Sequence, residues 1–395
     1  MLQGTFNALA ARGARAAIVD VHGLVLELST PGGPSSALAS YVLDYLPVPR
    51  LCAAEPVFAI QLCSDGDALD RIARILRAMP GSDVTPFRDV VYRAHACDAV
   101  TWFDVVRDDK DGLVGRYVIG WNGRTALVVV HPGVARPERL AVRVARELIL
   151  RWHENRQAIV FHAAGVARGD RGLLIAGHSG AGKTTSLLLA ADRGGTLLSN
   201  DRMLVSPAPE RWTLVGVPLP VRIGRATIEG IPKLQRFLGA AALARPQLLG
   251  QDPALLPIEF ASSKKIELTP RELATVLGGS VACAAPLHAI VLPELGQDER
   301  PAWCERASVA QARAALEASC FTPEDETWLS PWLLPRASRA LLAEAARATC
   351  EALAASVPAY RVGLGVQARA AGRLRRLRGL LRTLFDGRGP REVAV

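Results

Sequence analysis

The chain lacks the cysteine pattern and the long apolar runs that mark many secreted or membrane proteins. Its seven cysteines are odd in number and scattered, with no CxxC pair, so the sequence indicates neither a disulfide framework nor a zinc site. No run of about 18 apolar residues occurs, and the N-terminal segment has no apolar core followed by a small-residue cleavage site. We therefore expect a cytoplasmic protein without a membrane-spanning segment.

Acidic residues are scarce at the C-terminal end. The formal net charge is +9, and residues 361–395 hold nine arginines against only Asp386 and Glu392, so most of the excess lies there. The segment Gln367–Phe385 predicts a basic amphipathic helix with four leucines on one face: Leu374, Leu377, Leu381 and Leu384. Either this helix docks on an acidic peptide, a nucleic acid or an anionic membrane, or its leucines pack on their own domain and leave the arginines solvated, which we favour. No aromatic stacking pattern accompanies the arginines, so we expect no specific nucleic-acid partner.

The length and apolar content predict two cores with an appendage. Half of the 395 residues are apolar. Residues 1–155 alternate strand-like runs, among them Ala17–Leu28, with helical ones, and we expect an N-terminal α+β domain. Residues 156–335 predict a second, α/β domain, and residues 336–395 predict C-terminal helices that end in the basic tail.

The second domain begins with a pattern typical of a phosphate-binding loop. A strand at Ala158–Val166, a turn at 168–172 and a strand at Leu173–Ala176 predict a hairpin. The hairpin runs into a GxxxxGKT loop and a helix from Thr185. In such a loop the glycines let backbone N–H groups wrap a phosphate chain, the lysine contacts the outer phosphates and the threonine reaches Mg²⁺. The predicted nucleotide-binding residues are Gly177, Ser179, Gly180, Ala181, Gly182, Lys183, Thr184 and Thr185.

Sequence features that are missing narrow the class of nucleotide-binding protein. No NKxD segment that would read guanine and no LSGGQ-like signature occurs. Close behind the loop, only one segment combines a predicted strand, Thr196–Ser199, with an acid: Asn200 and Asp201 follow this strand, and Asp201 lies eighteen residues after Lys183. One helix and a tight return suffice to bring this carboxylate beside the phosphates.

Three features together resemble one known family. They are His162, fifteen residues ahead of Gly177; the loop itself; and the sequence Ser199-Asn200-Asp201-Arg202. This combination resembles the catalytic domain of bacterial HPr kinase/phosphorylase, whose core is related to the nucleotide-binding fold of phosphoenolpyruvate carboxykinase. The resemblance implies a P-loop kinase domain that uses ATP and Mg²⁺ to phosphorylate a hydroxyl.

Two departures indicate a divergent member of that family. The family carries two adjacent acids after the strand, whereas this chain has Asn200 before Asp201. The family's second signature, a glutamate and an arginine ahead of glycines, is not recognisable, and Glu229-Gly230 is at best a remnant. The chain is in this respect similar to the stand-alone kinases found near peptide-modification genes, and the family's own substrate cannot be transferred to it.

We assign candidate roles from the demands of phosphoryl transfer. Lys183 and the loop amides bind the β- and γ-phosphates, and Thr184 and Asp201 hold Mg²⁺, directly or through water. The base that orients the acceptor is Asp201 or, alternatively, His162. Further candidate clamps for transition-state charge are Arg202, Arg222 and the pair Lys264-Lys265, with solvated surface cations as the alternative.

The sequence therefore predicts an ATP-dependent kinase that acts on a peptide or protein serine or on a small-molecule alcohol. The N-terminal domain and the basic tail would help to select the acceptor. The alternative is a nucleotide-gated regulatory or scaffold protein without phosphotransfer, which Asn200 in place of an acid favours. Homo-oligomerisation is compatible with the sequence.

Overall fold

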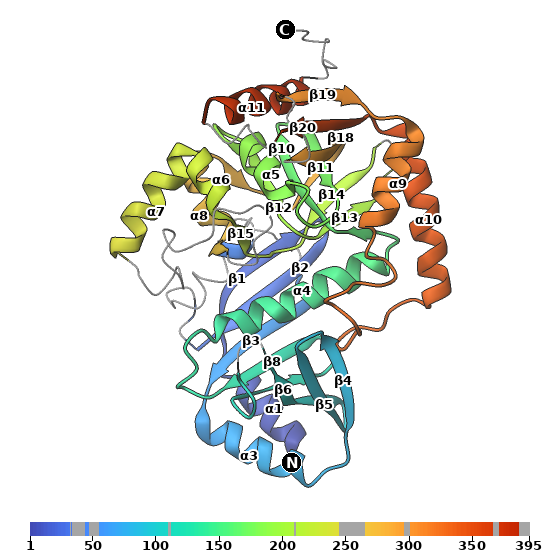
Figure 1. Ribbon diagram of the computed structural model, residues 1–395. Helices are drawn as coiled ribbons and strands as arrows, with labels where there is room; N and C mark the ends of the chain where they lie inside the picture. Colours follow the sequence, from blue (N-terminus) through green and yellow to red (C-terminus); the bar gives the residue numbers. More distant parts are fainter. Residues whose placement is uncertain are drawn as a thin grey trace. The chain divides into compact units, whose positions relative to one another are not determined.

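The computed structural model describes residues 1–31, 33, 44–46, 55–109, 112–208, 211–244, 265–295, 301–365 and 371–386 (Figure 1). They form a mixed α/β chain with several sheets. The chain divides into two compact units: unit 1 is Met1–Asn155 with Pro323–Ser338, and unit 2 is Arg156–Thr322 with Arg339–Val395. Among the described residues, no helix is long and apolar enough to cross a membrane.

Unit 1 is built on an eight-stranded mixed sheet of order β1-β2-β3-β8-β7-β6-β5-β4. Only the pairs β2/β3 and β3/β8 are parallel within this sheet. The strands are β1 (Ala14–Val21), β2 (Leu24–Thr30), β3 (Phe58–Ser64), β4 (Ser82–Phe87), β5 (Val90–Cys97), β6 (Val100–Asp108), β7 (Tyr117–Trp121) and β8 (Thr125–Val130). Helices α1 (Leu2–Ala10) and α3 (Gly66–Arg77) share one apolar core with the sheet, and α4 (Glu138–Glu154) contacts β2, β3 and β8.

The predicted single strand Ala17–Leu28 is wrong, because the chain turns back at its middle. β1 and β2 form an antiparallel hairpin, and the turn places His22 and Gly23 at φ 51° and 86°. The Asp20 carboxylate accepts a hydrogen bond of 2.7 Å from the Gly23 N–H, which stabilises this turn. Both strands are apolar, so the run of letters alone hides the break.

Residues 323–338 pack with unit 1, although the sequence interpretation put them with the second domain and the C-terminal segment. The N–H of Trp332 donates to Glu147 at 3.1 Å, and Arg336 forms an ion pair with Glu154 at 2.6 Å. Both carboxylates are buried on α4. These long-range contacts, which no local pattern reveals, hold the segment in place.

Unit 2 is organised around a ten-stranded sheet in which β11 lies between β10 and β18. Its strands and a separate β15/β16 pair are β9 (Ile159–Phe161), β10 (Ala163–Arg168), β11 (Arg171–Ala176), β12 (Thr196–Ser199), β13 (Met203–Ser206), β14 (Thr213–Gly216), β15 (Val221–Ile223), β16 (Ile266–Leu268), β17 (Ser280–Val281), β18 (Ala284–Leu295), β19 (Trp303–Arg306) and β20 (Ala359–Leu364). The helices are α5 (Lys183–Ala191), α6 (Arg225–Gly230), α7 (Pro232–Ala244), α8 (Pro270–Leu277), α9 (Val309–Ser319), α10 (Arg339–Ser356) and α11 (Ala371–Phe385). The predicted hairpin of β10 and β11 is confirmed.

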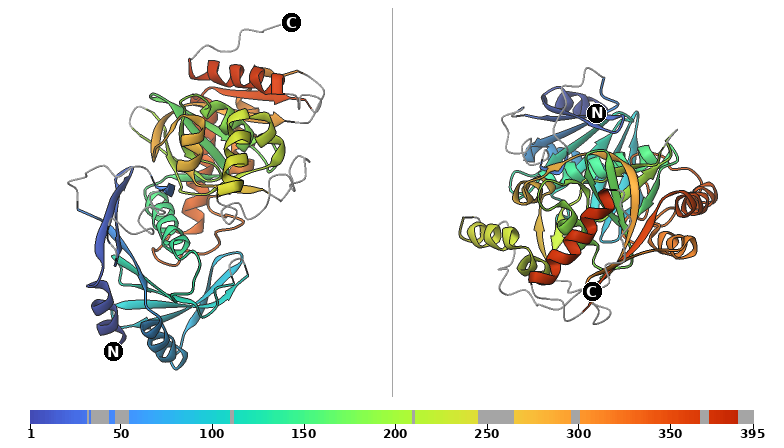
Figure 2. Two further views of the ribbon diagram at one scale, coloured as in Figure 1. Left: turned by 90° about the vertical axis from the view of Figure 1, so that its left-hand side faces the viewer. Right: turned by 90° about the horizontal axis from the view of Figure 1, so that it is seen from above.

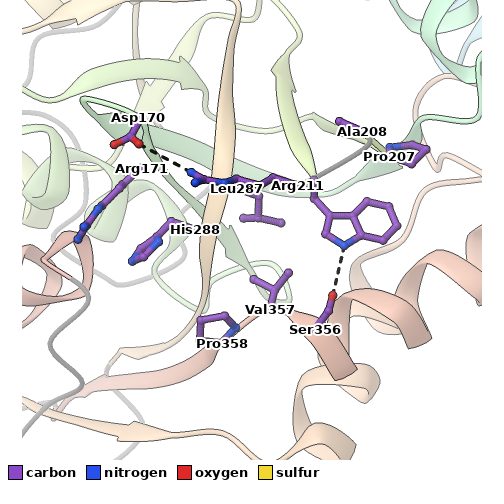
Figure 3. Close-up of a pocket in the computed structure, with 11 residues that line it drawn as sticks. Asp170, Arg171, Pro207, Ala208, Arg211, Leu287, His288, Ser356, Val357 and Pro358 are labelled. Atoms are coloured by element: carbon purple, nitrogen blue, oxygen red, sulfur yellow. Dashed lines mark hydrogen bonds and ion pairs between the residues drawn. The ribbon is translucent and has the colours of Figure 1, made fainter.

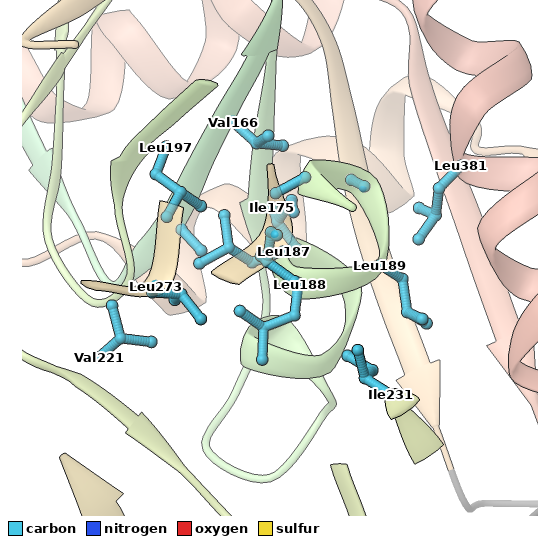
Figure 4. Packing of buried hydrophobic residues seen from close by; sticks show 14 of the residues in the cluster. Val166, Ile175, Leu187, Leu188, Leu189, Leu197, Val221, Ile231, Leu273 and Leu381 are labelled. Carbon is cyan, nitrogen blue, oxygen red and sulfur yellow. The ribbon is translucent and has the colours of Figure 1, made fainter. Parts of the chain in front are cut away.

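Two apolar cores cover the two faces of this sheet. Leu173 and Ile175 of β11 face the core that contains α5, α8 and α11, and Leu174 and Ala176 face the core that contains α9 and α10. Figure 4 shows Leu187 and Leu188 of α5 inside the first core. Since both faces are buried, β11 reads as a continuous apolar run, as buried parallel strands do.

Helix α11 falls within the predicted basic helix Gln367–Phe385, of which residues 367–370 lie outside the described residues (Figure 2). Leu374, Leu377, Leu381 and Leu384 are all buried in the core with α5, which confirms the packing interpretation for these leucines. The Arg378 guanidinium pairs with Asp192 at 2.6 Å. Other arginines of the helix are exposed on its outer face: Arg375, Arg376 and Arg382.

Candidate functional site

The predicted phosphate-binding loop joins β11 to α5. Residues 178–180 are exposed, whereas Lys183, the first residue of α5, is only 8 % exposed. Gly182 caps the helix at φ 105°, a conformation that side chains rarely adopt, and a Cβ added there would overlap Leu295. The Leu295 N–H donates to Ala181 O at 3.1 Å, so β18 fixes the far side of the loop. The sequence therefore needs glycine at this position to bring the loop onto β18.

The side chain of Lys183 folds back onto the loop that precedes it. Its Nζ donates to Gly177 O at 2.8 Å and to His178 O at 3.1 Å. The nine-residue helix α5 begins at the same place, and the first N–H groups of a helix have no partner within the helix itself. An exposed loop with a buried ammonium group and converging amides fits a polyphosphate chain.

The two threonines that follow lie in different surroundings. Thr184 is partly exposed beside the loop, where its hydroxyl can reach a metal ion bound to phosphate. The Thr185 hydroxyl instead shares a hydrogen bond of 2.8 Å with Thr227 of α6. The side chain of Thr185 therefore links α5 to α6. Only the backbone N–H of Thr185 is left to make the predicted contact with a nucleotide.

His162 and Asp201 lie close together because the two chain segments that contain them each change their strand-pairing partner at these residues. The predicted strand Ala158–Val166 is split at His162: β9 pairs with β13, where Phe161 faces Met203, and β10 pairs with β12, where Gly165 faces Ser199. The residues between the two pairings, 162–164 and 200–202, therefore lie opposite one another. His162 Nε2 is 3.1 Å from Asp201 Oδ1.

Phe321, which the sequence interpretation missed, completes this cluster. The His162 ring stacks on the Phe321 ring with centroids 4.9 Å apart, and the Arg202 guanidinium lies 4.7 Å from the same ring centroid. Arg202 also pairs with the second oxygen of Asp201. Backbone bonds at 2.7 Å from His162 N–H to Ser319 O and at 2.8 Å from Phe321 N–H to Val160 O fix the segment after α9 beside β9. No local sequence signal marks Phe321, since it follows an ordinary helix far along the chain.

Asp201 is ionised over the whole physiological range of pH. Burial alone would raise its pKa, but the hydrogen bond from His162 and the charges of Arg202, His162 and Lys183 outweigh burial and hold the pKa well below its usual range. Because an ionised carboxylate only accepts hydrogen bonds, His162 carries a proton on Nε2. Ala163, which follows His162, pairs with Ala176, which directly precedes Gly177, so the His162–Asp201 pair and the start of the loop lie at the same end of the sheet.

A second lysine, Lys265, interacts electrostatically with Asp201. Burial and the charge of Arg222 lower the pKa of Lys265, and Asp201 raises it. Lys265 directly precedes β16, while Arg222 on β15 is exposed and lies 3.5 Å from Glu267. Lys264 lies outside the described residues. Of the predicted clamps, Arg202 and Lys265 are thus electrostatic neighbours of Asp201.

Asn200 and Glu229 take no part in holding Asp201. Asn200 is 7 % exposed, and its Oδ1 has no hydrogen-bond partner in the described part of the chain. Glu229 accepts a hydrogen bond of 2.6 Å from Arg225 on the same helix. Glu229, the possible remnant of the family signature, therefore forms an ion pair within its own helix α6.

The acids near the loop limit how Mg²⁺ can be held. Within the described residues, no group of three or more His, Cys, Asp or Glu side chains could hold a metal ion. Both oxygens of Asp201 are engaged, by His162 and Arg202. Thr184 and Asp201 could supply only one or two protein oxygens to a magnesium ion, and phosphates and waters would have to complete its coordination. This is how Mg²⁺ is usually bound together with a nucleotide.

Comparison with known proteins adds one likeness. No protein-family model matches the chain, and no curated protein matches it. Among solved structures, the Hpr(Ser) kinase/phosphatase from Coxiella burnetii matches with a TM-score of 0.25 and 10 % identity, over 58 % of this chain and 94 % of that chain. A likeness of this strength carries no argument about activity.

Proposed function

We propose that unit 2 is an ATP-dependent phosphotransferase that moves the γ-phosphate to a hydroxyl group. The acceptor would be a peptide or protein serine or a small-molecule alcohol. The observation that carries the proposal is the position of the His162–Asp201 pair at the same end of the sheet as the loop, since Ala163 pairs with Ala176 directly before Gly177. A kinase needs a polar group beside the loop that orients the acceptor hydroxyl, and a hydrolase needs one that orients water, so a phosphorylated acceptor is what separates the two.

Lys183 and the α5 amides would bind the β- and γ-phosphates. Thr184 and Asp201 would hold Mg²⁺, directly or through water, and the ion when bound supplies charge neutralisation between the phosphates. Lys265 adds positive charge near Asp201 and would stabilise the transferring group. These contacts position the phosphate chain and leave little covalent work for the protein.

Asp201 would orient the acceptor by accepting a hydrogen bond from its hydroxyl. A carboxylate with a low pKa is a weak base, which suits a loose transition state in which the hydroxyl proton leaves late. His162 donates to Asp201 through Nε2 and would keep the carboxylate turned toward the acceptor. In this assignment Asp201 is the catalytic residue and His162 positions it.

One set of observations favours the alternative of nucleotide-gated partner binding without transfer. Asn200 stands where the resembling family has a second acid, and both oxygens of Asp201 already have partners. In that case the nucleotide would order the loop, and the exposed arginines of α11 (Arg375, Arg376 and Arg382) would contact an acidic partner.

The experiment is mass spectrometry of candidate serine peptides and alcohols after incubation with the full chain, Mg²⁺ and ATP. We expect a phosphorylated product with the wild type, loss of product with Lys183→Ala, and retained nucleotide binding without product for Asp201→Asn. His178→Ala is the matched control, since His178 is exposed in the loop and should leave the product unchanged. Partner binding that depends on ATP, with no product from any acceptor, would support the alternative instead.

A further inference from the structure

A cavity of unit 2 opens at the ends of β11 and β18 that are remote from the phosphate-binding loop. Its volume is about 570 Å³, within the usual range of small-ligand pockets. Its walls come from the β10–β11 turn, from β18, from the end of α10, and from four described residues between β13 and β14, which are Pro207, Ala208, Arg211 and Trp212 (Figure 3). Four separate segments thus converge on one hollow.

The cavity is distinct from the nucleotide site. Arg171, at the cavity, is the first residue of β11, and the phosphate-binding loop follows the last, Ala176. At roughly 3.3 Å per residue, a six-residue strand separates the two by about 20 Å. β18 likewise runs from His288 at the cavity to Leu295, which bonds to the loop.

The polar groups of the cavity favour an anion. Burial and the charge of Arg171 lower the pKa of His288, Asp170 opposes this effect, and Arg211 adds to it. Arg211 and Asp170 lie 3.8 Å apart, and both side chains are largely exposed, so this ion pair is weak and open to competition. The His288 ring has no hydrogen-bond partner among the described residues. Two guanidinium groups and a ring N–H therefore outweigh one carboxylate.

The remaining wall is apolar and contains a fixed aromatic plane. The Trp212 indole N–H donates to Ser356 Oγ at 3.3 Å, and the Ser356 hydroxyl donates to Ala352 O at 2.7 Å. Leu287 and Val357 also line the cavity. A rigid indole beside aliphatic side chains suits a flat apolar body.

We propose that this cavity binds a small organic carboxylate with a flat apolar body, its carboxylate toward Arg211 and His288 and its body against Trp212. Charge-assisted hydrogen bonds to the guanidinium and the imidazole would hold the anion. Arg171 also donates to the Phe385 carbonyl at the end of α11. The ligand would thus lie beside the residue that anchors this helix.

Benzoate is the probe, and the side-chain NMR signals of His288 and Trp212 in the full chain are the readout. We expect benzoate to shift both signals and to raise the pKa of His288, so that its affinity falls as the pH rises through that pKa. Arg211→Ala and His288→Ala should each weaken binding by about tenfold, since each removes a charge-assisted hydrogen bond.

Lys183→Ala is the control, because it alters the nucleotide site and should leave benzoate binding unchanged. If Lys183→Ala still binds benzoate, the cavity proposal stands whether or not the proposed phosphotransfer is correct. Inorganic phosphate is the second probe, and a larger response of His288 to phosphate than to benzoate would overturn the carboxylate class. Unchanged signals at about 10 mM benzoate, or equal affinity for Arg211→Ala and wild type, would overturn the site itself.

Discussion

Asp201 links the candidate site to the stability of unit 2. Its pKa is depressed in the folded protein by His162, Arg202 and Lys183, which together outweigh burial. The stabilisation is therefore fully present above the unfolded value of 3.8 and is lost as the pH falls below it toward the folded pKa. We expect the free energy of unfolding of wild type to exceed that of Asp201→Asn at about pH 7 and this difference to shrink below about pH 4. Urea denaturation of both proteins across this range tests it, and a pH-independent difference would contradict the assignment.

Phe321 tests whether the aromatic ring positions the catalytic groups. Replacing it with leucine keeps an apolar side chain but removes the face that His162 and Arg202 share. We expect kcat of the proposed transfer to fall by about tenfold in Phe321→Leu, in line with cation–π energies, with the nucleotide affinity unchanged. Phe321→Tyr keeps the face and should restore the rate. Equal loss in both variants would mean that the ring only fills space.

Whether a residue of the site could be predicted from the sequence depends on how far along the chain its partners lie. The loop from Gly177 to Thr184 and the acid Asp201 follow one strand, one helix and one return, and local spacing is enough to predict that they approach one another. His162 is one strand further away. Phe321 and Lys265 reach the cluster through tertiary packing, so spacing gave no reason to single out Phe321.

At the scale of elements, the loop geometry depends on Gly182. Its φ of 105° and the Leu295 side chain beside it leave no room for a Cβ. We expect Gly182→Ala to distort the loop at a cost of about 1–3 kcal/mol and to weaken nucleotide binding by tenfold or more, to be measured by calorimetry. Gly169→Ala is a suitable comparison, since Gly169 also has positive φ but meets nothing within 4 Å and lies in the β10–β11 turn. Equal nucleotide affinity in Gly182→Ala and wild type would remove the loop from the site.

Helix α11 belongs to the core of unit 2. Leu381 is 0 % exposed and packs with α5 residues in the same core. We expect Leu381→Ala to lower the free energy of unfolding by about 2–5 kcal/mol, while the exposed Arg375→Ala stays within about 0.5 kcal/mol. Thermal or urea unfolding compares the two. If both variants unfold like wild type, α11 is not part of the cooperative core.

The elements that the sequence predicted wrongly share one cause. Ala17–Leu28 and Ala158–Val166 each read as one apolar strand, and each is broken where the chain changes partners. Apolar periodicity reports burial, but it does not report which strand supplies the hydrogen bonds. The break at His162 matters most, since it creates the position that faces Asp201.

At the scale of the whole molecule, the chain forms two compact units, and residues 323–338 return to the first. Composition indicates enough apolar surface for two cores, but the return depends on the buried pairing of Arg336 with Glu154, which only the folded chain reveals. The roles of unit 1 in acceptor selection and of the exposed α11 arginines in binding an acidic partner stay predictions.

The central claim is that a nucleotide bound by unit 2 gives its γ-phosphate to an acceptor hydroxyl. The most direct measurement is the rate of ADP formation by the purified full chain with Mg²⁺ and ATP, with and without the acceptor found by mass spectrometry. The account predicts a rate that rises with acceptor concentration, matches phosphorylated product one to one, and falls by about a hundredfold or more in Asp201→Asn. ADP formation at the same rate without any acceptor, or no ADP at all while ATP binds, would contradict it.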